Sequence, residues 1–352
     1  MNKKLSGFEL VDEAKKKILI LDGAMGTMIQ NEGLSESDFR GKEFKNHDVP
    51  LKGNNDFLNL TKPEIISKIH LNYLEAGADI IETNTFNSNQ TSQRDYKCES
   101  LSYRLNYEGA KLAKNAVIKY KKKNNKKIFV AGVLGPTNRT CSMSPDVNRP
   151  EYRNINFETL KKDYMNSIKA LLEGGSDLIF IETIFDTLNA KSAMMAVYEI
   201  EKELKIKIPL MLSATITDLS GRTLSGQTLE AFYNSVVHVK PISVGINCAL
   251  GPKELDSHLK ELSRFSDFLV SIHSNAGLPN AFGGYDETPE KMAEFAGRWS
   301  KDSHLNIIGG CCGTTPEHIL AMKNAVEKFR PRKLRKIKHS FKLSGLEPFN
   351  LD

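Results

Sequence analysis

The most constraining feature of this chain is an alternation of short apolar runs with longer amphipathic stretches. The apolar, β-branched runs lie at 18–22, 78–86, 128–135, 177–183, 209–215, 242–248, 268–274 and 305–311. Helical periodicity lies at 63–76, 97–120, 157–174, 187–204, 227–239, 253–265, 288–301 and 315–329. Eight strand–helix units in strict order predict a single closed (β/α)8 TIM barrel, with a doubly wound open sheet as the lesser alternative. No Gly-x-Gly-x-x-Gly follows the first run, which disfavours the dinucleotide-binding form of that alternative.

Two connections and the C-terminal end depart from the repeat. Residues 23–60 follow the first predicted strand and residues 136–156 follow the third, and loops this long usually serve as lids or substrate-binding segments. We therefore expect a barrel domain over 1–330. The repeat is lost beyond it, so residues 331–352 are predicted to be a linker-like C-terminal tail.

The composition restricts the partners and the compartment. The net charge of +6 includes two local basic clusters, 121–127 and 330–336. Neither cluster has interleaved aromatic residues, so both are interpreted as a solvated loop and tail rather than a nucleic-acid site. Docking of an acidic partner is a lesser interpretation of the second cluster. The N-terminus has no apolar signal region and no run of 18 apolar residues occurs, so no membrane segment is predicted. An odd count of five cysteines then favours the cytoplasm and free or metal-bound thiols.

Polar residues end nearly every predicted strand. They are Asp22, then Glu82, Thr83 and Asn84, then Glu182 and Thr183, then Asn247 and Cys248, then Ser274 and Asn275, and finally Cys311 and Cys312. In (β/α)8 barrels the catalytic groups lie at these carboxyl ends. Charge at the end of an apolar run is unexpected unless the group faces a cavity. The pattern therefore favours an enzyme over a structural barrel.

Three of the five cysteines fall at two of these strand ends. Cys248 ends the sixth run, and Cys311 and Cys312 stand side by side after the eighth, where neighbouring thiols do not readily form a disulfide. These two ends lie within ~10 Å of each other, because adjacent strands are ~4.8 Å apart. Three thiolates suit Zn²⁺ and leave its fourth position open for an incoming thiol, which zinc would hold as a reactive thiolate. The trio thus indicates sulfur alkylation; three small buried side chains are the simpler alternative.

The glycines beside the pair, Gly309, Gly310 and Gly313, are predicted to let the backbone bend so that both thiols point inward. The remaining cysteines, Cys98 and Cys141, lie on a predicted helix and a long loop. We interpret both as incidental.

Two carboxylates and one histidine are further candidates. Asp22 precedes a turn, beginning at Gly23, whose amides are suited to a carboxylate group, and Glu182 is suited to a substrate ammonium. Ion pairing with Lys or Arg at the barrel mouth explains either carboxylate about as well. His273 lies inside a predicted strand and is interpreted as a core histidine.

Three motifs together resemble the homocysteine S-methyltransferase family. They are Ile20-Leu21-Asp22-Gly23-Ala24-Met25-Gly26-Thr27, Ile246-Asn247-Cys248-Ala249-Leu250-Gly251-Pro252, and the segment from Gly309 to Ile319 that contains the cysteine pair. The resemblance covers about 10 to 330. It implies that Cys248, Cys311 and Cys312 hold zinc and that zinc binds the sulfur of homocysteine. It also implies that Asp22, Gly23, Glu182 and Asn247 contact the substrate.

Within the family the chain looks most like the homocysteine-binding module of cobalamin-dependent methionine synthase. The segment 343–348 resembles the connection into the folate module of that enzyme. The resemblance implies methylcobalamin as the methyl donor, with cobalamin- and folate-binding modules supplied in cis or in trans; a separately encoded subunit is slightly favoured over an excised fragment. Betaine or S-methylmethionine as the donor is the alternative. A structural-zinc or thiol redox protein is a lesser one.

Overall fold

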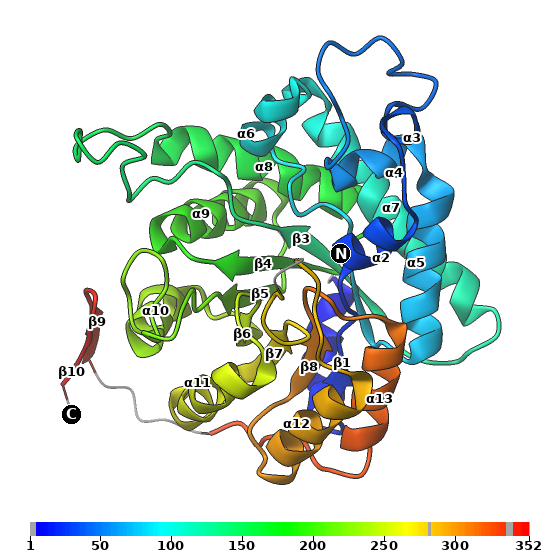
Figure 1. The fold of residues 1–352 in the computed structure, drawn as a ribbon. Coiled ribbons are helices and arrows are strands. Elements are labelled where there is room, and N and C mark those ends of the chain that lie inside the picture. Colours follow the sequence, from blue (N-terminus) through cyan, green and yellow to red (C-terminus); the bar gives the residue numbers. More distant parts are fainter. Residues whose placement is uncertain (1–4, 281–282, 336–340, 352) are drawn as a thin grey trace.

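The computed structural model describes residues 5–280, 283–335 and 341–351. Eight parallel strands form one sheet in the order β1-β8-β7-β6-β5-β4-β3-β2 (Figure 1). Their bounds are β1 Leu19–Ile20, β2 Ile80–Glu82, β3 Phe129–Leu134, β4 Leu178–Ile184, β5 Leu210–Ala214, β6 Ser243–Asn247, β7 Leu269–Ser274 and β8 Ile307–Gly310. A bridge between Leu21 and Ile80 closes the sheet between β1 and β2. The predicted (β/α)8 barrel is confirmed.

Eight helices follow the strands and surround the barrel. They are α5 Pro63–Ala76, α7 Ser102–Lys121, α8 Phe157–Gly174, α9 Thr187–Leu204, α10 Leu229–Val236, α11 Pro252–Phe265, α12 Pro289–Lys301 and α13 Pro316–Val326. Helix α5 ends at Gly77 and α8 at Gly175, which have φ of 106° and 107°, a conformation that glycine adopts without strain. The predicted helix 97–120 begins later, at Ser102, because Glu99–Leu101 forms a 3-10 turn.

The first long connection contains short helices, α2 Met25–Asn31, α3 Glu36–Arg40 and α4 Leu58–Thr61. A further short helix, α6 Gln90–Gln93, follows β2, and α1 Glu9–Ala14 precedes the barrel. The second long connection, 136–156, has no helix or strand. Short 3-10 turns occur at Ser6–Phe8, Asn55–Phe57, Arg94–Tyr96, Glu99–Leu101 and Val237–Val239.

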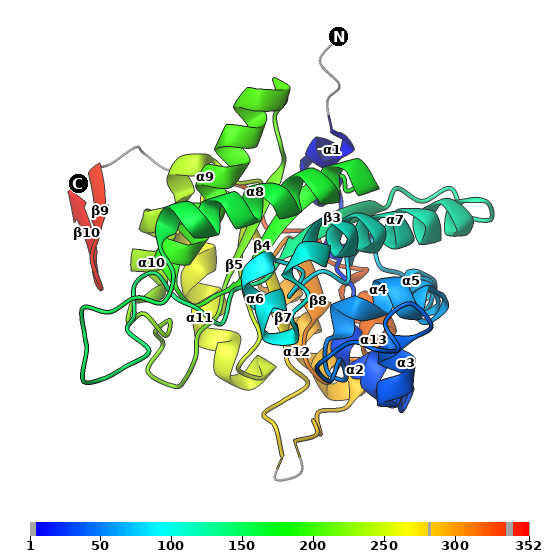
Figure 2. The ribbon, with the colours of Figure 1, turned by 90° about the horizontal axis from the view of Figure 1, so that it is seen from above.

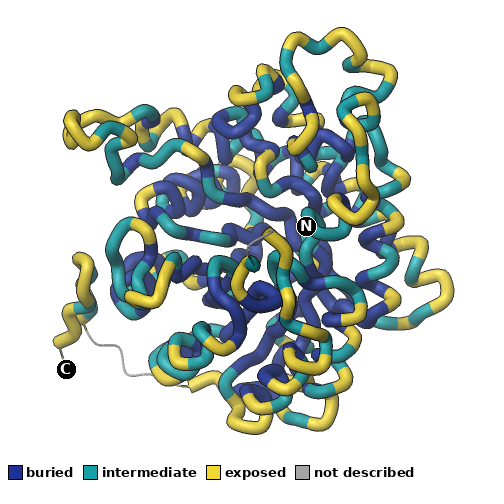
Figure 3. Tube along the Cα trace, viewed as in Figure 1, coloured by how far each residue is buried: buried dark blue, intermediate teal, exposed yellow. Residues whose placement is uncertain are grey.

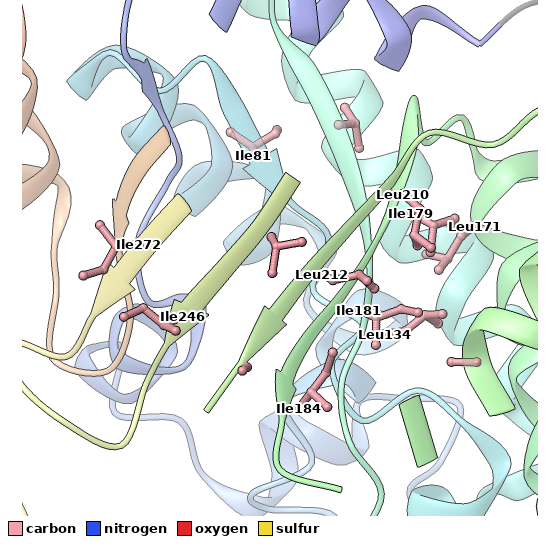
Figure 4. Close-up of a cluster of buried hydrophobic side chains, with 14 of the residues drawn as sticks. Ile81, Leu134, Leu171, Ile179, Ile181, Ile184, Leu210, Leu212, Ile246 and Ile272 are labelled. Atoms are coloured by element: carbon pink, nitrogen blue, oxygen red, sulfur yellow. The ribbon is translucent and has the colours of Figure 1, made fainter. Parts of the chain in front are cut away.

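Alternate strand residues build two apolar layers. One layer fills the barrel interior and includes Leu19, Leu21, Phe129, Phe180 and Met211, and Leu10 and Ala14 of α1 belong to it. The other layer lies between strands and helices and includes Ile81, Ile179, Leu212 and Ile246 (Figure 4). The trace is mostly buried in the centre of the molecule and mostly exposed at its periphery (Figure 3). Helix α1 therefore closes the amino end of the strands, while α2, α3 and the loop after β7 lie on the opposite side (Figure 2).

The C-terminal segment forms a hairpin of β9 Phe341–Ser344 and β10 Pro348–Leu351 that lies against α10. The Ser344 hydroxyl donates to the Ala231 carbonyl, and the amide of Thr228 donates to the Leu346 carbonyl. Within the basic cluster at 330–336, Arg332 is buried and donates to the carbonyls of Ser263, Ser266 and Phe268. The barrel packing thus extends to Arg332, two residues beyond the boundary expected at 330. Residues 336–340 lie outside the described part of the chain.

Candidate active site

A cavity of about 370 Å³ lies at the carboxyl ends of the strands. Its walls come from the strand ends and from the connection that contains α2. Four carboxylates, three thiols and one imidazole line it: Asp22, Asp56, Glu82, Glu182, Cys248, Cys311, Cys312 and His273. Among the described lining residues none is Lys or Arg. Such a concentration of acid without a basic side chain is unusual unless a cationic ligand enters.

The three predicted thiols converge at the mouth of the cavity. The Sγ atoms of Cys248, Cys311 and Cys312 all lie within 4.8 Å of one another, and those of Cys248 and Cys312 are 3.8 Å apart. Tetrahedral zinc with Zn–S bonds of about 2.3 Å separates its sulfur ligands by about 3.8 Å. All three residues are partly exposed, whereas Cys98 and Cys141 are buried. The trio therefore differs from ordinary core cysteines and fits a three-thiolate metal site with an accessible fourth position.

The backbone that carries the thiols is strained on one side. Cys248 and Ala249 have φ of 60° and 57°, although neither is glycine. This left-handed pair turns the chain at the end of β6, and such strain persists where packing around it enforces the conformation. On the other side Gly313 has φ of 82° and packs against Tyr285, where a Cβ atom would lie 2.3 Å from that side chain.

The expected bend at Gly309 and Gly310 is wrong, because both residues belong to β8. Their missing side chains serve close packing instead. A Cβ atom on Gly310 would lie 2.3 Å from Oγ1 of Thr314, and one on Gly309 would lie 2.7 Å from Cβ of Leu21. Of the three glycines, only Gly313 provides the bend.

The three thiols share their protons. Hydrogen bonds from Cys248 and Cys311 lower the pKa of Cys312 to about 3. Hydrogen bonding to the other two thiols, together with burial, raises the pKa of Cys311 well above its usual range. Hydrogen bonding among the thiols therefore favours the thiolate at Cys312 and the protonated thiol at Cys311.

Three carboxylates at the ends of β1, β2 and β4 also line the cavity. Oδ2 of Asp22 accepts a hydrogen bond from the Glu82 amide at 3.0 Å, while its Oδ1 is buried and has no partner among the described residues. Oε1 of Glu82 is likewise buried and has no partner among the described residues. Burial raises the pKa of both carboxyl groups, and the nearby charge of Glu182 raises them further. Neither Asp22 nor Glu182 has an ion pair with Lys or Arg within the described chain, so the ion-pair interpretation fails.

The imidazole of His273 faces the cavity, so its interpretation as a satisfied core histidine is wrong. Its Nε2 lies 3.2 Å from Oε2 of Glu182, and its Nδ1 is buried with no partner in the described structure. A strand residue points either into the barrel or toward the helices. Near the end of β7 the inward direction leads to the cavity rather than to the apolar core.

Asn247, predicted to contact the substrate, lies behind the cavity wall. Its side-chain amide donates to Oγ1 of Thr183 at 2.8 Å and to Oε2 of Glu182 at 3.4 Å. Its Oδ1 accepts from the Thr183 amide and from the Ser213 hydroxyl. Thr183 has φ of 55°, a rare conformation for a β-branched residue, and lies where the register between β4 and β5 shifts. Asn247 therefore holds a strained residue and the carboxylate of Glu182 in place.

Gly23 lines the cavity as predicted, next to Asp22. A Cβ atom at this position would lie 2.8 Å from Oγ1 of Thr314 and 3.0 Å from the ring of Tyr73. Glu82, predicted only as a strand end, and Tyr285, which was not predicted, also line the cavity, and the hydroxyl of Tyr285 is hydrogen-bonded to Cys312. The apolar run that ends in Glu82 was the feature of the sequence that could have identified Glu82 as a site residue. Tyr285 lies in a loop without a comparable pattern.

Comparison with known proteins agrees with this architecture. The family model described as homocysteine S-methyltransferase matches residues 19–326. Two crystal structures of the homocysteine methyltransferase MmuM from Escherichia coli have a similar fold. The oxidized form has 23% sequence identity and a TM-score of 0.68, over 90% of this chain and 98% of that one. The metallated form has 23% identity and a TM-score of 0.66, over 88% of this chain and 96% of that one.

The similarity to these structures concerns the fold, whereas the family match spans the whole barrel and includes every candidate site residue described above. The chain therefore belongs to the homocysteine S-methyltransferase family.

Proposed function

We propose that this chain is a zinc-dependent methyltransferase that converts homocysteine to methionine, with Cys248, Cys311 and Cys312 holding the metal. The observation that carries the proposal is the position of three mutually close thiols at the mouth of a cavity whose carboxylates have no Lys or Arg partner among the described residues. When bound, zinc would lower the pKa of the homocysteine thiol and keep the sulfur as a nucleophilic thiolate. A reducing compartment such as the cytoplasm would keep the protein thiols free.

The remaining groups of the cavity orient the substrate. Glu182, fixed by His273 and Asn247, and Asp22 accept hydrogen bonds from the substrate ammonium, while amides of the turn at Gly23 receive its carboxylate group. With its amino-acid end anchored, the sulfur is held near the thiol trio. Methyl transfer forms the new S–C bond while the electron pair of the old bond stays with the donor. Holding sulfur and methyl in line supplies much of the rate.

For the donor we propose methylcobalamin presented by a separate module, which itself receives the methyl group from 5-methyltetrahydrofolate. The C-terminal hairpin supports this choice. Its polar face lies against α10, while Phe341, Leu343, Phe349 and Leu351 form cross-strand pairs on the other face and are each more than half exposed. Exposed apolar patches of this kind are typical of surfaces that contact another protein or domain. A small-molecule donor needs no such surface.

The second candidate donor is a small cation such as S-methylmethionine, with betaine as a further option. The acidic cavity favours it, because four carboxylates with no Lys or Arg among the described lining residues attract a cation, and a volume of about 370 Å³ accommodates two small amino acids. The two candidates make opposite demands. A corrin must be presented at the mouth, whereas a sulfonium must enter the cavity.

Assays of methionine formation from homocysteine with each donor in turn test the choice. We expect turnover with methylcobalamin, and faster turnover with a cobalamin-binding module added. Activity with S-methylmethionine or betaine and none with methylcobalamin would reverse the assignment. X-ray absorption at the zinc edge tests the metal site independently. A fourth sulfur entering the shell on addition of homocysteine supports catalysis, and a closed shell indifferent to homocysteine supports a structural-zinc or redox protein.

A further inference from the structure

We propose that Glu82 is a third ligand of the substrate ammonium and that it makes the cavity specific for thiols with an unsubstituted primary amine. This assignment rests on the proposed function, since an ammonium site matters only if an amino-acid thiol is the substrate. Glu82 ends β2, and its carboxylate lies in the same cavity as Asp22, Glu182 and the thiol trio.

The first support is the number of open acceptors. One oxygen each of Asp22 and Glu82 is buried and has no hydrogen-bond donor among the described residues. Oε2 of Glu182 accepts from His273 and Asn247, so that carboxylate is fixed in position. A primary ammonium has three N–H donors. Three carboxylates from three strands therefore match the three donors of one ammonium, and two carboxylates alone would leave one donor unmatched.

The second support is the spacing. A carboxylate oxygen of Glu82 and one of Glu182 lie within 4.8 Å of each other, and a ring nitrogen of His273, which donates to Glu182, lies within the same distance of both. Three acceptors around an ammonium nitrogen, with N···O distances of about 2.8 Å in tetrahedral directions, are about 4.6 Å apart. The separation of the Glu82 and Glu182 oxygens is therefore compatible with two acceptors of one ammonium.

The third support is the charge balance. Buried carboxylates without a cationic partner are costly, and no Lys or Arg is present among the described residues of the cavity wall. The raised pKa values of Asp22 and Glu82 are consistent with a site that lacks its cation. An entering ammonium restores the balance, and an N-acylated or des-amino thiol does not. Glu82 would thus discriminate between thiols by their amine group, which the zinc site does not contact.

The test uses the full chain with Co²⁺ in place of zinc, because binding of a thiol to cobalt produces a charge-transfer absorption independent of any methyl donor. Homocysteine and 4-mercaptobutyrate, which lacks the amine, are titrated into the wild type and into Glu82→Gln. We expect the Kd of homocysteine to rise by about 10- to 100-fold in the variant, as for loss of a charge-assisted hydrogen bond, and that of 4-mercaptobutyrate to change less than about threefold. The matched control is Glu64→Gln at an exposed position on α5, for which neither Kd should change.

Equal weakening of both thiols in Glu82→Gln would overturn the assignment, as would an unchanged Kd for homocysteine. A second metal ion per chain that disappears in the variant would also overturn it, because the cluster would then be a metal site. If Glu82→Gln does not fold, Glu82→Asp keeps the charge but withdraws it by one methylene, and an intermediate loss for homocysteine alone is expected. Absence of any charge-transfer band with the wild type would instead reject the proposed function itself.

Discussion

Buried carboxylates are paired with lysines at one end of the barrel and lack such partners among the described residues at the other. At the amino end Asp79 is buried and accepts from Lys17 at 2.6 Å and Lys126 at 2.9 Å, and Asp177 accepts from Lys114 at 2.8 Å. At the carboxyl end Asp22 and Glu182 have no such partner within the described chain. The amino end is also closed by α1, while the carboxyl end opens into the cavity. A carboxylate paired with lysine stabilises the fold, whereas an unpaired carboxylate in a cavity indicates a binding site for a ligand.

The largest expected effect is that of a substitution in the thiol trio. Cys312→Ser should remove one metal ligand and lower methionine formation by far more than about 100-fold, since even loss of a group that only supports a ligand costs about 10- to 100-fold. The free energy of unfolding of the metal-free protein should change little, because Cys312 is only partly buried. Metal content by elemental analysis and turnover measure the two effects.

The matched control is Cys98→Ala, which removes a buried thiol that does not line the cavity. It should retain the metal and the activity, at some cost in stability. Full metal content in Cys312→Ser would contradict the ligand assignment.

At the amino end the effect should fall on stability alone. Asp79→Asn removes the charge that holds Lys17 and Lys126, and Lys126 is itself largely withdrawn from solvent. Breaking a buried ion pair from one side costs several kcal/mol, and partial exposure of the lysines reduces this to about 2–3 kcal/mol. Urea unfolding should show the loss, with the kcat and KM of the folded enzyme unchanged. A lowered kcat with unchanged stability would contradict the prediction that Asp79 affects stability alone.

Glu182→Gln at the mouth should show the opposite behaviour. The KM for homocysteine should rise by about 10- to 100-fold, because a charged acceptor of the ammonium is lost. Stability should stay the same or increase, since the change relieves repulsion with Asp22 and Glu82. Paired steady-state kinetics and urea unfolding decide between this outcome and a purely structural role, for which stability would fall and KM would not move.

Most of the fold was predictable because, in each strand–helix unit, the periodicity of the apolar residues and the length of the segment indicate the same type of element. Helices α5, α8 and α9 have the predicted bounds, and every predicted strand is present. The short helices α2, α3 and α4 were not predicted, since each is only a few residues long and depends on packing over the mouth. The hairpin was missed for another reason. Its apolar residues point outward, so the alternation in 341–351 does not indicate which face is buried.

The candidate site was predictable where chemistry and chain position coincide. Cysteines at two strand ends had to meet, because the strand order fixes the distance between those ends. The orientation of single side chains was not available from the sequence. Asn247 precedes Cys248, yet it points behind the wall to Thr183, and His273 points into the cavity one position before the strand ends. A strained turn and a register shift determine these directions, and neither leaves a pattern in composition.

The smallest expected effect concerns a buried polar group that belongs to neither end. His70 on α5 is fully buried, and neither ring nitrogen has a hydrogen-bond partner in the described structure. Burial lowers its pKa to about 4 from the usual 6.5. The unfolded chain therefore takes up a proton below about pH 6.5 that the folded protein refuses until about pH 4. The stability associated with the neutral ring is present above pH 6.5 and is lost as the pH falls.

Between pH 7.5 and pH 5.5 this loss amounts to about 1 kcal/mol. His70→Leu removes the titrating group, so the difference in unfolding free energy between wild type and variant should shift by that amount in favour of the variant. Subtracting the two proteins cancels the contributions of Asp22, Glu82 and every other group common to both. Urea unfolding at the two pH values measures the shift, and a difference independent of pH would mean that the ring is hydrated or paired in solution. Because His70 lies outside the cavity, the KM for homocysteine should not change, which separates a burial effect from the ligand-dependent charges of the mouth.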